Sequence, residues 1–151
     1  MCLTHRTFLV ELAITIQKGQ RLLTLYHFWS STCSRKVRIC LAEKKLAWKS
    51  HHVDIVNKCD NLKKWYLKIN SNGVVPTLKH NGKIIFESNI ILEYLDDCFP
   101  DTPLKPNDVY EVSKMKLWLD RAETVVHKNV NVLSWNRRHM PRMKHLSHEE
   151  H

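Results

Sequence analysis

Two kinds of apolar pattern alternate along the first hundred residues of the chain. Leu22–Phe28 is an apolar-rich run of strand length, and the positions after it have the three-to-four spacing of a helix that ends near Lys45. A second strand is expected over Trp48–Val53. Two strands joined by a helix are usually parallel neighbours in one sheet, so a parallel pair is predicted.

The next segment has helical spacing, then a hairpin, then helical spacing again. Asn81-Gly82 separates two short apolar runs, and this dipeptide is the strongest short-range signal of a β-hairpin. Residues 70–73 predict a turn before the hairpin. The expected elements, in chain order, are a helix, two strands and a helix over Cys59–Ile69, Thr77–His80, Lys83–Phe86 and Ser88–Phe99.

A change of composition follows these elements. Residues 100–106 contain three prolines and predict a linker, and a long amphipathic helix is expected from about Asp108 to Trp135. Its inward positions should be Val112, Met115, Leu119, Ala122 and Val126. The order β-α-β-α-β-β-α predicts an α/β, thioredoxin-like domain followed by the start of an all-α domain. The expected division is an N-terminal extension, a thioredoxin-like domain, a linker and the start of a helical domain, over 1–20, 21–100, 101–107 and 108–151.

Composition narrows the classes of function. The chain has 151 residues, 43% hydrophobic and 26% charged, which is typical of a globular protein, and no apolar run reaches the roughly 20 residues of a membrane helix. The net charge of +9 is compatible with nucleic acid, but no zinc-finger, helix-turn-helix or basic–aromatic pattern supports that partner. A solvated basic face is favoured, with neither nucleic acid nor membrane as partner.

Cysteine and histidine usage adds two expectations. The five cysteines are odd in number and form no CxxC pair, which favours free thiols in a reducing compartment and hence a cytoplasmic location. The first twenty residues lack a small-residue cleavage site after their apolar run. His145, His148 and His151 recur every three residues, but without a His-Glu-x-x-His pattern surface histidines are favoured over a zinc site, and no metal is expected.

Two segments have the chemistry of a ligand site. Pro76 lies between a turn and a strand, where a residue without an N–H is unusual, and this makes sense if the Val75–Pro76 bond is cis and the backbone beside it serves a ligand. Glu87 and Ser88 stand at an expected helix start. Backbone donors, a carboxylate and a hydroxyl together suit a small zwitterionic ligand.

A third segment, Ser31–Ser34, lies between a strand end and a helix start. The unpaired N–H groups and the dipole of a helix N-terminus stabilise a thiolate. Two functional interpretations stay open: Ser31 donates its O–H to the sulfur of a bound thiol, or Cys33 is itself activated by the same field. The simpler interpretation is that Ser31 or Thr32 caps the helix and Cys33 packs in its first turn.

These motifs carry a family resemblance. Leu25–Arg38 resembles the first strand, active loop and first helix of glutathione transferases, and Val75–Leu78 resembles their cis-proline motif. Glu87–Ser88 and the apolar residues after it resemble the start of their γ-glutamyl-binding helix, and residues 100–104 resemble their interdomain linker. The likeness covers about residues 22–150 and implies a complete thioredoxin-like domain followed by a truncated helical domain.

The active loop resembles two kinds of member. Ser31 matches the activating serine of zeta-like members, and Cys33 matches the cysteine of members similar to bacterial reductive dehalogenases. Asn72–Pro76 also resembles bacterial β-etherase-like transferases. One departure is Gly73, which stands where zeta-like members often have a polar glutathione contact, so that contact must come from elsewhere.

The resemblance implies glutathione as co-substrate, a small electrophilic substrate, with aromatic ones among the candidates, and a homodimer when full length. The Val75 backbone, next to Pro76, would pair with the cysteinyl part of glutathione, and Glu87 and Ser88 would hold its γ-glutamyl group. Ser31 would activate the glutathione thiol. One alternative is Cys33-dependent thiol transfer or reductive dehalogenation, and another is a non-catalytic glutathione-binding module, since the helical domain is truncated.

Overall fold

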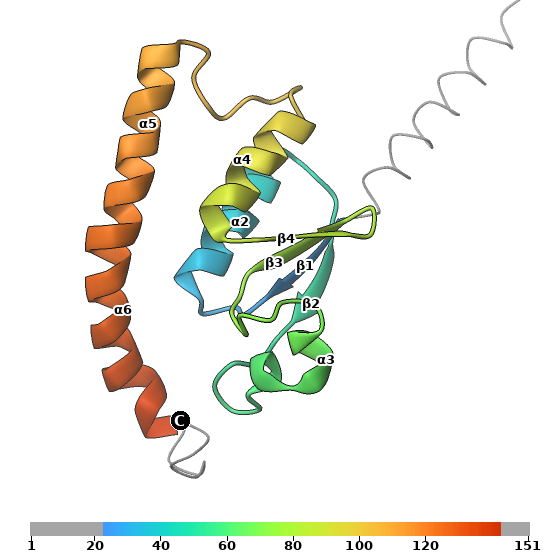
Figure 1. Cartoon of the computed structure of the whole chain (residues 1–151), viewed down its shortest axis with the longest axis vertical. Helices are drawn as coiled ribbons and strands as arrows, with labels where there is room; N and C mark the ends of the chain where they lie inside the picture. Colours follow the sequence, from blue (N-terminus) through green and yellow to red (C-terminus); the bar gives the residue numbers. More distant parts are fainter. Residues whose placement is uncertain (1–22, 143–151) are drawn as a thin grey trace, which may run out of the picture.

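The computed structural model describes residues 23–142 (Figure 1). The expected extension over residues 1–20, Leu22 at the start of the first strand, and the histidines 145, 148 and 151 lie outside this range.

A four-stranded sheet forms the centre of the fold, in the order β2-β1-β3-β4. β1 pairs in parallel with β2, while β3 is antiparallel to both β1 and β4, so the expected βαβ unit and hairpin are both present. The strands occupy nearly the expected positions: β1 Leu23–His27, β2 Lys49–His52, β3 Thr77–His80 and β4 Lys83–Phe86.

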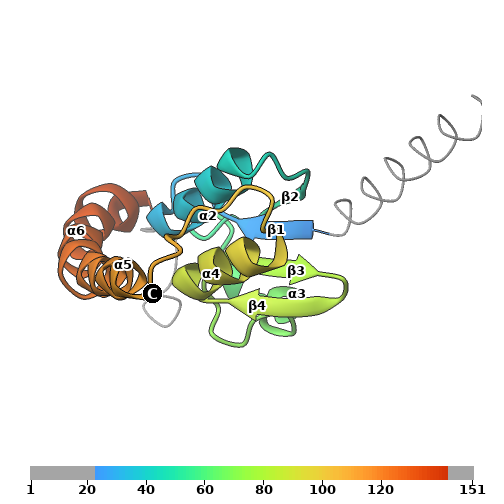
Figure 2. The ribbon, with the colours of Figure 1, turned by 90° about the horizontal axis from the view of Figure 1, so that it is seen from above.

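Helices cover both faces of this sheet. Leu23 and Leu25 point to the face where α2 (Thr32–Glu43) and α4 (Ser88–Cys98) pack, and together they form the larger buried cluster. Tyr26 points the other way, because neighbouring side chains of a strand alternate. Its ring lies 6.2 Å from that of Tyr66 in the short helix α3. Figure 1 shows α4 and α3 on opposite sides of the strands, and Figure 2 shows α2 and α4 side by side. The α/β, thioredoxin-like fold class is confirmed.

The helix expected over Cys59–Ile69 is wrong as a single element. A 3₁₀ turn at Asp60–Leu62 is separated from α3 (Lys64–Leu67) by Lys63, whose backbone is extended. The backbone N–H of Asp60 donates to the Asp54 carbonyl at 2.8 Å, and its carboxylate accepts from the Asp54 N–H. These bonds tie the turn to the preceding loop, so they hold it out of the line of α3.

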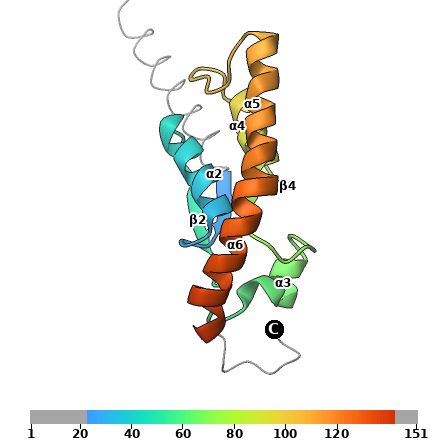
Figure 3. The same ribbon diagram turned by 90° about the vertical axis from the view of Figure 1, so that its left-hand side faces the viewer.

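A long helix follows the linker and runs beside α2 and α4 (Figure 3). It contains α5 (Val109–Arg121), a π-helical turn (Ala122–His127), α6 (Lys128–Ser134), a second π-helical turn (Trp135–His139) and a final 3₁₀ turn (Met140–Arg142). The Asp108 carboxylate caps it by accepting the Glu111 N–H at 3.0 Å. Residues 109–142 are called the long helix below.

The inward face of the long helix differs from the expected one beyond Leu119. Ala122 and Val126 are exposed, whereas Glu123 and His127 are partly buried against the rest of the protein. The π-helical turn causes this change, because its i→i+5 hydrogen bonds widen the turn and rotate the later residues around the axis. The apolar inward positions expected at Ala122 and Val126 are therefore wrong.

The outward face of the long helix is strongly apolar. Its exposed large side chains include Leu117, Trp118, Val125, Val126, Val130, Val132 and Leu133. Across residues 23–142, no helix combines the length and the apolar character that crossing a membrane requires.

A buried ion pair anchors the linker that leads to the long helix. The Lys44 ammonium donates to the Asp96 carboxylate at 2.6 Å and to the carbonyls of Phe99 and Thr102 at 2.9 and 2.7 Å, which uses all three of its protons. Burial alone would raise the pKa of Asp96. The hydrogen bonds that it accepts from Lys44 and from the N–H groups of Leu104 and Lys105 outweigh burial and hold that pKa below its usual range.

Arg38 connects the loop after β1 to the buried side chain of His27. Arg38 donates to the Trp29 carbonyl at 2.9 Å and lies 3.3 Å from His27 Nδ1. A guanidinium can only donate, so Nδ1 accepts and the hydrogen is on Nε2, which lies 2.8 Å from the Ser50 hydroxyl. Burial, then Arg38, then His52 and His51 lower the pKa of His27 to about 4.

We expect Lys44→Met to lower the free energy of unfolding by about 3–5 kcal/mol, because it leaves a buried carboxylate unpaired. Urea denaturation measures this loss. Lys114→Met is the control, because its pair with Glu111 is exposed and should contribute less than about 1 kcal/mol. Equal losses in the two variants would contradict the anchoring role of Lys44.

His27 should make stability depend on pH. Its pKa is lower in the folded protein, so the unfolded chain binds the proton more tightly and stability falls as the pH drops from 6.5 to about 4. The loss attributable to His27 is about 3 kcal/mol. Urea denaturation at several pH values should show a shallower dependence for His27→Gln, and an unchanged dependence would rule out this origin.

Candidate active site

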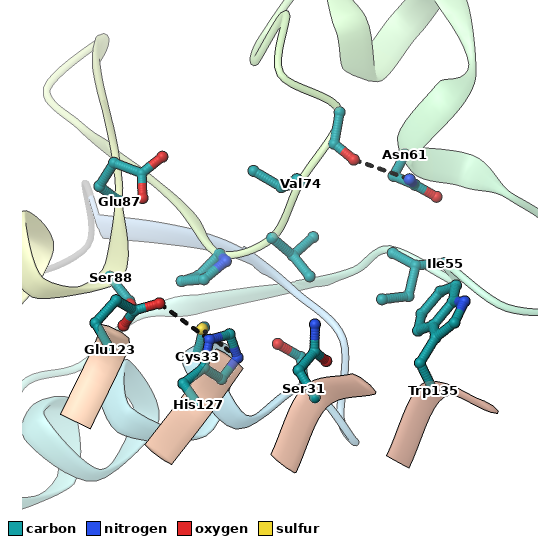
Figure 4. Close-up of a pocket in the computed structure, with 14 residues that line it drawn as sticks. Ser31, Cys33, Ile55, Asn61, Val74, Glu87, Ser88, Glu123, His127 and Trp135 are labelled. Atoms are coloured by element: carbon teal, nitrogen blue, oxygen red, sulfur yellow. Dashed lines mark hydrogen bonds and ion pairs between the residues drawn. The ribbon is translucent and has the colours of Figure 1, made fainter. Parts of the chain in front are cut away.

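A cavity of about 390 Å³ opens between the sheet, the N-termini of α2 and α4, and the long helix (Figure 4). It is the place where the three candidate segments of the sequence meet. All six candidate residues line it: Ser31, Cys33, Val75, Pro76, Glu87 and Ser88. Glu87 and Ser88 lie on one side of the cavity and Ile55 and Trp135 on the other.

The loop before β3 is held by a buried polar network. The Val75–Pro76 peptide bond is cis. The Tyr66 hydroxyl donates to the Val74 carbonyl at 2.7 Å and lies 2.9 Å from the Thr77 hydroxyl. The Asn70 amide donates to the same two oxygens at 3.1 and 3.0 Å. The backbone N–H of Val75 makes no hydrogen bond to another of residues 23–142.

Asn61 holds the turn on this side of the cavity. Its Nδ2 donates to the Gly73 carbonyl at 2.8 Å, while its Oδ1 is buried and finds no partner in the described part of the chain. Gly73 has φ of +62°, and an added Cβ would lie 3.3 Å from the Asn61 carbonyl oxygen, so glycine suits this turn. The polar group missing at Gly73 is thus present at Asn61, which no sequence motif marks.

The start of α4 presents opposite charges side by side. Glu87 has φ of 69°, a conformation that residues other than glycine rarely adopt, and its side chain does not cap the helix. Within residues 23–142 its carboxylate forms neither a hydrogen bond nor an ion pair. Ser88 is buried beside it, in the first helical turn, where backbone N–H groups lack helical acceptors. A zwitterion can meet both signs of charge here.

Ser31 caps α2, as the simpler interpretation of this segment expected. Its Oγ accepts the Ser34 N–H at 3.2 Å. The hydroxyl hydrogen is not used by this bond, so Ser31 can still donate it to a group in the cavity. The capping interpretation and the functional interpretation of Ser31 are therefore compatible.

The burial of Cys33 opposes the activation that was expected from the helix field. Burial raises the pKa of the Cys33 thiol, and this effect outweighs the opposing influence of Lys36 and a hydrogen bond from Ser88. Glu123 and Glu87 raise the pKa further. The resting group is therefore the protonated thiol, and it needs a proton acceptor to become a nucleophile.

The long helix contributes two polar groups that no motif in the sequence marks. His127 Nε2 lies 3.4 Å from the Cys33 sulfur, and His127 Nδ1 lies 3.0 Å from the Glu123 carboxylate. The other oxygen of Glu123 accepts from Lys36 at 3.2 Å, and Lys36 also donates to Asn89 at 2.8 Å. The sequence analysis expected Ala122 and Val126 on this face and marked neither Glu123 nor His127.

The one group of potential metal ligands found within residues 23–142 consists of Cys33, Glu123 and His127. One ligand atom from each of Cys33, Glu123 and His127 lies within 4.8 Å of the others. In the contacts described above, however, Cys33 and Glu123 face opposite nitrogens of the imidazole. One ring can offer only one nitrogen to a shared ion, so the geometry suits a row of hydrogen bonds better than a metal centre.

A second cavity of about 260 Å³ adjoins the first and shares Ser31, His127 and Trp135 with it. Its remaining walls include the aromatic ring of Phe28 and the cationic side chains of Arg35 and Arg138. The two cavities thus meet at these shared residues, and the cationic side chains lie in the second one.

Comparison with known sequences identifies relatives. The profile of the glutathione S-transferase N-terminal domain matches residues 25–103. Protein LigF of Sphingobium sp. strain SYK-6 is 35% identical over 115 residues, which cover 75% of this chain and 44% of LigF. Glutathione S-transferase U24 of Arabidopsis thaliana is 38% identical over 110 residues, covering 72% of this chain and 47% of that protein. The chain spans about half the length of these curated relatives.

Solved structures agree with these matches. The crystal structure of the β-etherase LigF from the same Sphingobium strain superimposes with a TM-score of 0.80 and 33% identity, over 85% of this chain and 54% of that one. A glutathione transferase homologue from Sulfitobacter, solved with bound glutathione, has a TM-score of 0.68 and 26% identity, over 85% of this chain and 59% of that one.

Proposed function

Because the chain belongs to the glutathione S-transferase family, we propose that its cavity binds glutathione and activates the glutathione thiol for attack on an electrophilic substrate. The observation that carries this proposal is the convergence of all six candidate residues on one cavity at two helix N-termini. Its volume of about 390 Å³ falls in the range of roughly 300–1,000 Å³ that is usual for small-ligand sites.

The charges around the cavity suggest how glutathione lies in it. The γ-glutamyl ammonium would pair with the Glu87 carboxylate, and the γ-glutamyl carboxylate would accept from Ser88 and the first N–H groups of α4. The cysteinyl part would pair with the free backbone N–H of Val75, as an added strand does at a sheet edge.

Ser31 would then stabilise the glutathione thiolate. Its hydroxyl hydrogen is available, and the Ser34 N–H that it accepts makes the hydroxyl a better donor. The N-terminus of α2 favours negative charge at the same point. A thiolate held by donors that are already oriented is the catalytic contribution expected of this site.

The adjoining cavity would hold the electrophile. Phe28 and Trp135 suit an aromatic substrate, and Arg35 and Arg138 favour one that carries negative charge. A cytoplasmic location and a homodimer of the full-length protein stay predictions from the family resemblance.

A second function, thiol transfer through Cys33, is favoured by one observation, the contact of the Cys33 sulfur with His127. Conjugation and thiol transfer use the same glutathione site but differ in the attacking sulfur: that of glutathione in the first, that of Cys33 in the second.

Glu87→Gln should weaken glutathione binding by about tenfold to a hundredfold, because a hydrogen bond to a charged group contributes about 1.5–3 kcal/mol. Calorimetry on the purified chain measures the affinity. Glu43→Gln makes the same change of charge at the exposed, opposite end of α2 and should bind as the wild type does. Equal affinities of the three proteins would argue against the assigned γ-glutamyl contact.

Ser31→Ala should abolish conjugation of glutathione to an aryl chloride, with a loss of about a hundredfold or more, while glutathione binding survives. The alanine also removes the helix cap, which costs about 1 kcal/mol of stability. Ser31→Gly is the matched variant, because glycine replaces a cap at a cost of only about a few tenths of a kcal/mol. Turnover equal to wild type in both variants would exclude the serine role.

A further inference from the structure

Three side chains from two distant segments form a row beside the start of α2. Cys33 comes from the first turn of α2, and Glu123 and His127 come from neighbouring turns of the long helix. The Cys33 sulfur lies 3.4 Å from His127 Nε2, and His127 Nδ1 lies 3.0 Å from Glu123 Oε1. Each ring nitrogen therefore has one partner, and Figure 4 shows the three side chains grouped at one end of the cavity.

The chemistry of the end groups decides the direction of the hydrogen bonds. A carboxylate can only accept, so His127 Nδ1 must be the donor toward Glu123. In the neutral ring the other nitrogen, Nε2, then carries the lone pair, and this lone pair faces the Cys33 thiol. Hydroxyl and thiol nucleophiles are activated by this kind of arrangement, in which a carboxylate orients a base and the base faces the nucleophile.

The row is itself anchored. The second carboxylate oxygen of Glu123 accepts from Lys36 at 3.2 Å, and Lys36 is held by Asn89 at 2.8 Å. The π-helical turn is what directs Glu123 and His127 toward Cys33, and such turns are frequent at functional sites.

The surroundings of Cys33 create the need for a base. Burial raises the pKa of its thiol, so little thiolate forms unaided at neutral pH. The charged and titratable groups that face the thiol come from α2, from the start of α4 and from the long helix: Lys36, Glu87, Glu123 and His127. Lys36 is the only fixed cation among them, and it is paired with Glu123.

We propose that Cys33, His127 and Glu123 form a catalytic row in which Cys33 attacks the glutathionyl sulfur of a mixed disulfide between glutathione and a second thiol. The glutathionyl half of this substrate would be held at Glu87, Ser88 and Val75, and this part of the proposal rests on the function proposed above. His127 Nε2 takes the thiol proton as the Cys33 sulfur bonds to the glutathionyl sulfur. The disulfide bond breaks, and the departing thiolate takes the proton back from His127.

A second exchange returns the enzyme to its starting state. Free glutathione gives its thiol proton to His127 and attacks the glutathionyl sulfur of the Cys33 mixed disulfide. Glutathione disulfide forms, and the Cys33 sulfur leaves as a thiolate that recovers the proton. In sum, the mixed disulfide and glutathione become a free thiol and glutathione disulfide, so the sulfur of the second thiol is reduced and the sulfur of the free glutathione is oxidised.

The test is the rate at which iodoacetamide alkylates Cys33 in the 151-residue chain, followed by peptide mass spectrometry across a range of pH. At pH 7, His127→Gln should slow this reaction by about a hundredfold, since general-base assistance contributes roughly 10²–10⁴. The variant should approach the wild-type rate only at the high pH where the thiol ionises unaided. Glu123→Gln should give an intermediate rate, because its amide oxygen still accepts from His127.

Two controls separate this effect from a general disturbance of the fold. Alkylation of the exposed Cys98 in the same samples should not change. Glu111→Gln removes a carboxylate from an exposed pair on α5 and should leave the Cys33 rate at its wild-type value. Turnover of a mixed disulfide should fall in His127→Gln in step with the alkylation rate.

The outcomes distinguish this inference from the proposed function. If wild type and His127→Gln alkylate Cys33 equally over the whole pH range, the catalytic row is wrong even when glutathione binds. If Cys33 reactivity depends on His127 but calorimetry shows no glutathione binding, the row stands and the glutathione site is wrong. Dependence on His127 together with binding that is lost in Glu87→Gln supports both.

Discussion

The placement of the long helix depends on one buried ion pair. Lys44 at the end of α2 holds Asp96 near the end of α4 and also binds two carbonyls of the linker. The chain therefore leaves the sheet domain at a fixed point and in a fixed direction. Glu123 and His127 belong to the helix that begins a few residues later. The wall of the cavity that they form therefore depends on a contact at the C-terminal end of α2, whereas the cavity lies at the N-terminal end of α2.

The segments that form the cavity are held in place in different ways. Tyr66, Asn70 and Thr77 hold the loop around the cis bond from within the protein, so the backbone of Val75 is presented to a ligand without cost in its own hydrogen bonds. The N-termini of α2 and α4 supply fixed positive ends. The long helix contributes only side-chain contacts, chiefly the pairs of Lys36 with Glu123 and of Lys116 with Glu93.

The two proposed functions use different sulfur nucleophiles in this arrangement, that of bound glutathione and that of Cys33. Ser31 and Cys33 lie two residues apart at the start of α2, and both line the same cavity. Ser31 has a hydrogen to donate and would serve a sulfur that belongs to the ligand, whereas Cys33 has a base beside it and would use its own sulfur. Burial of the Cys33 thiol keeps it protonated at rest, so the two roles do not compete for one negative charge.

Local signals were enough to determine the sheet, α2, α4 and the cavity-lining segments around Ser31, Val75 and Glu87, because strand pattern, hairpin turn and helix starts are properties of adjacent residues. The break at Lys63, the raised pKa of Cys33 and the roles of Asn61, Glu123 and His127 were decided only by the tertiary structure. The break at Lys63 depends on the Asp54 carbonyl in the preceding loop, the pKa of Cys33 depends on the surface that buries it, and the contact of His127 depends on a thiol 94 positions away. Helical periodicity could not reveal the inward turn of Glu123 and His127, because a π-helical turn changes the period itself.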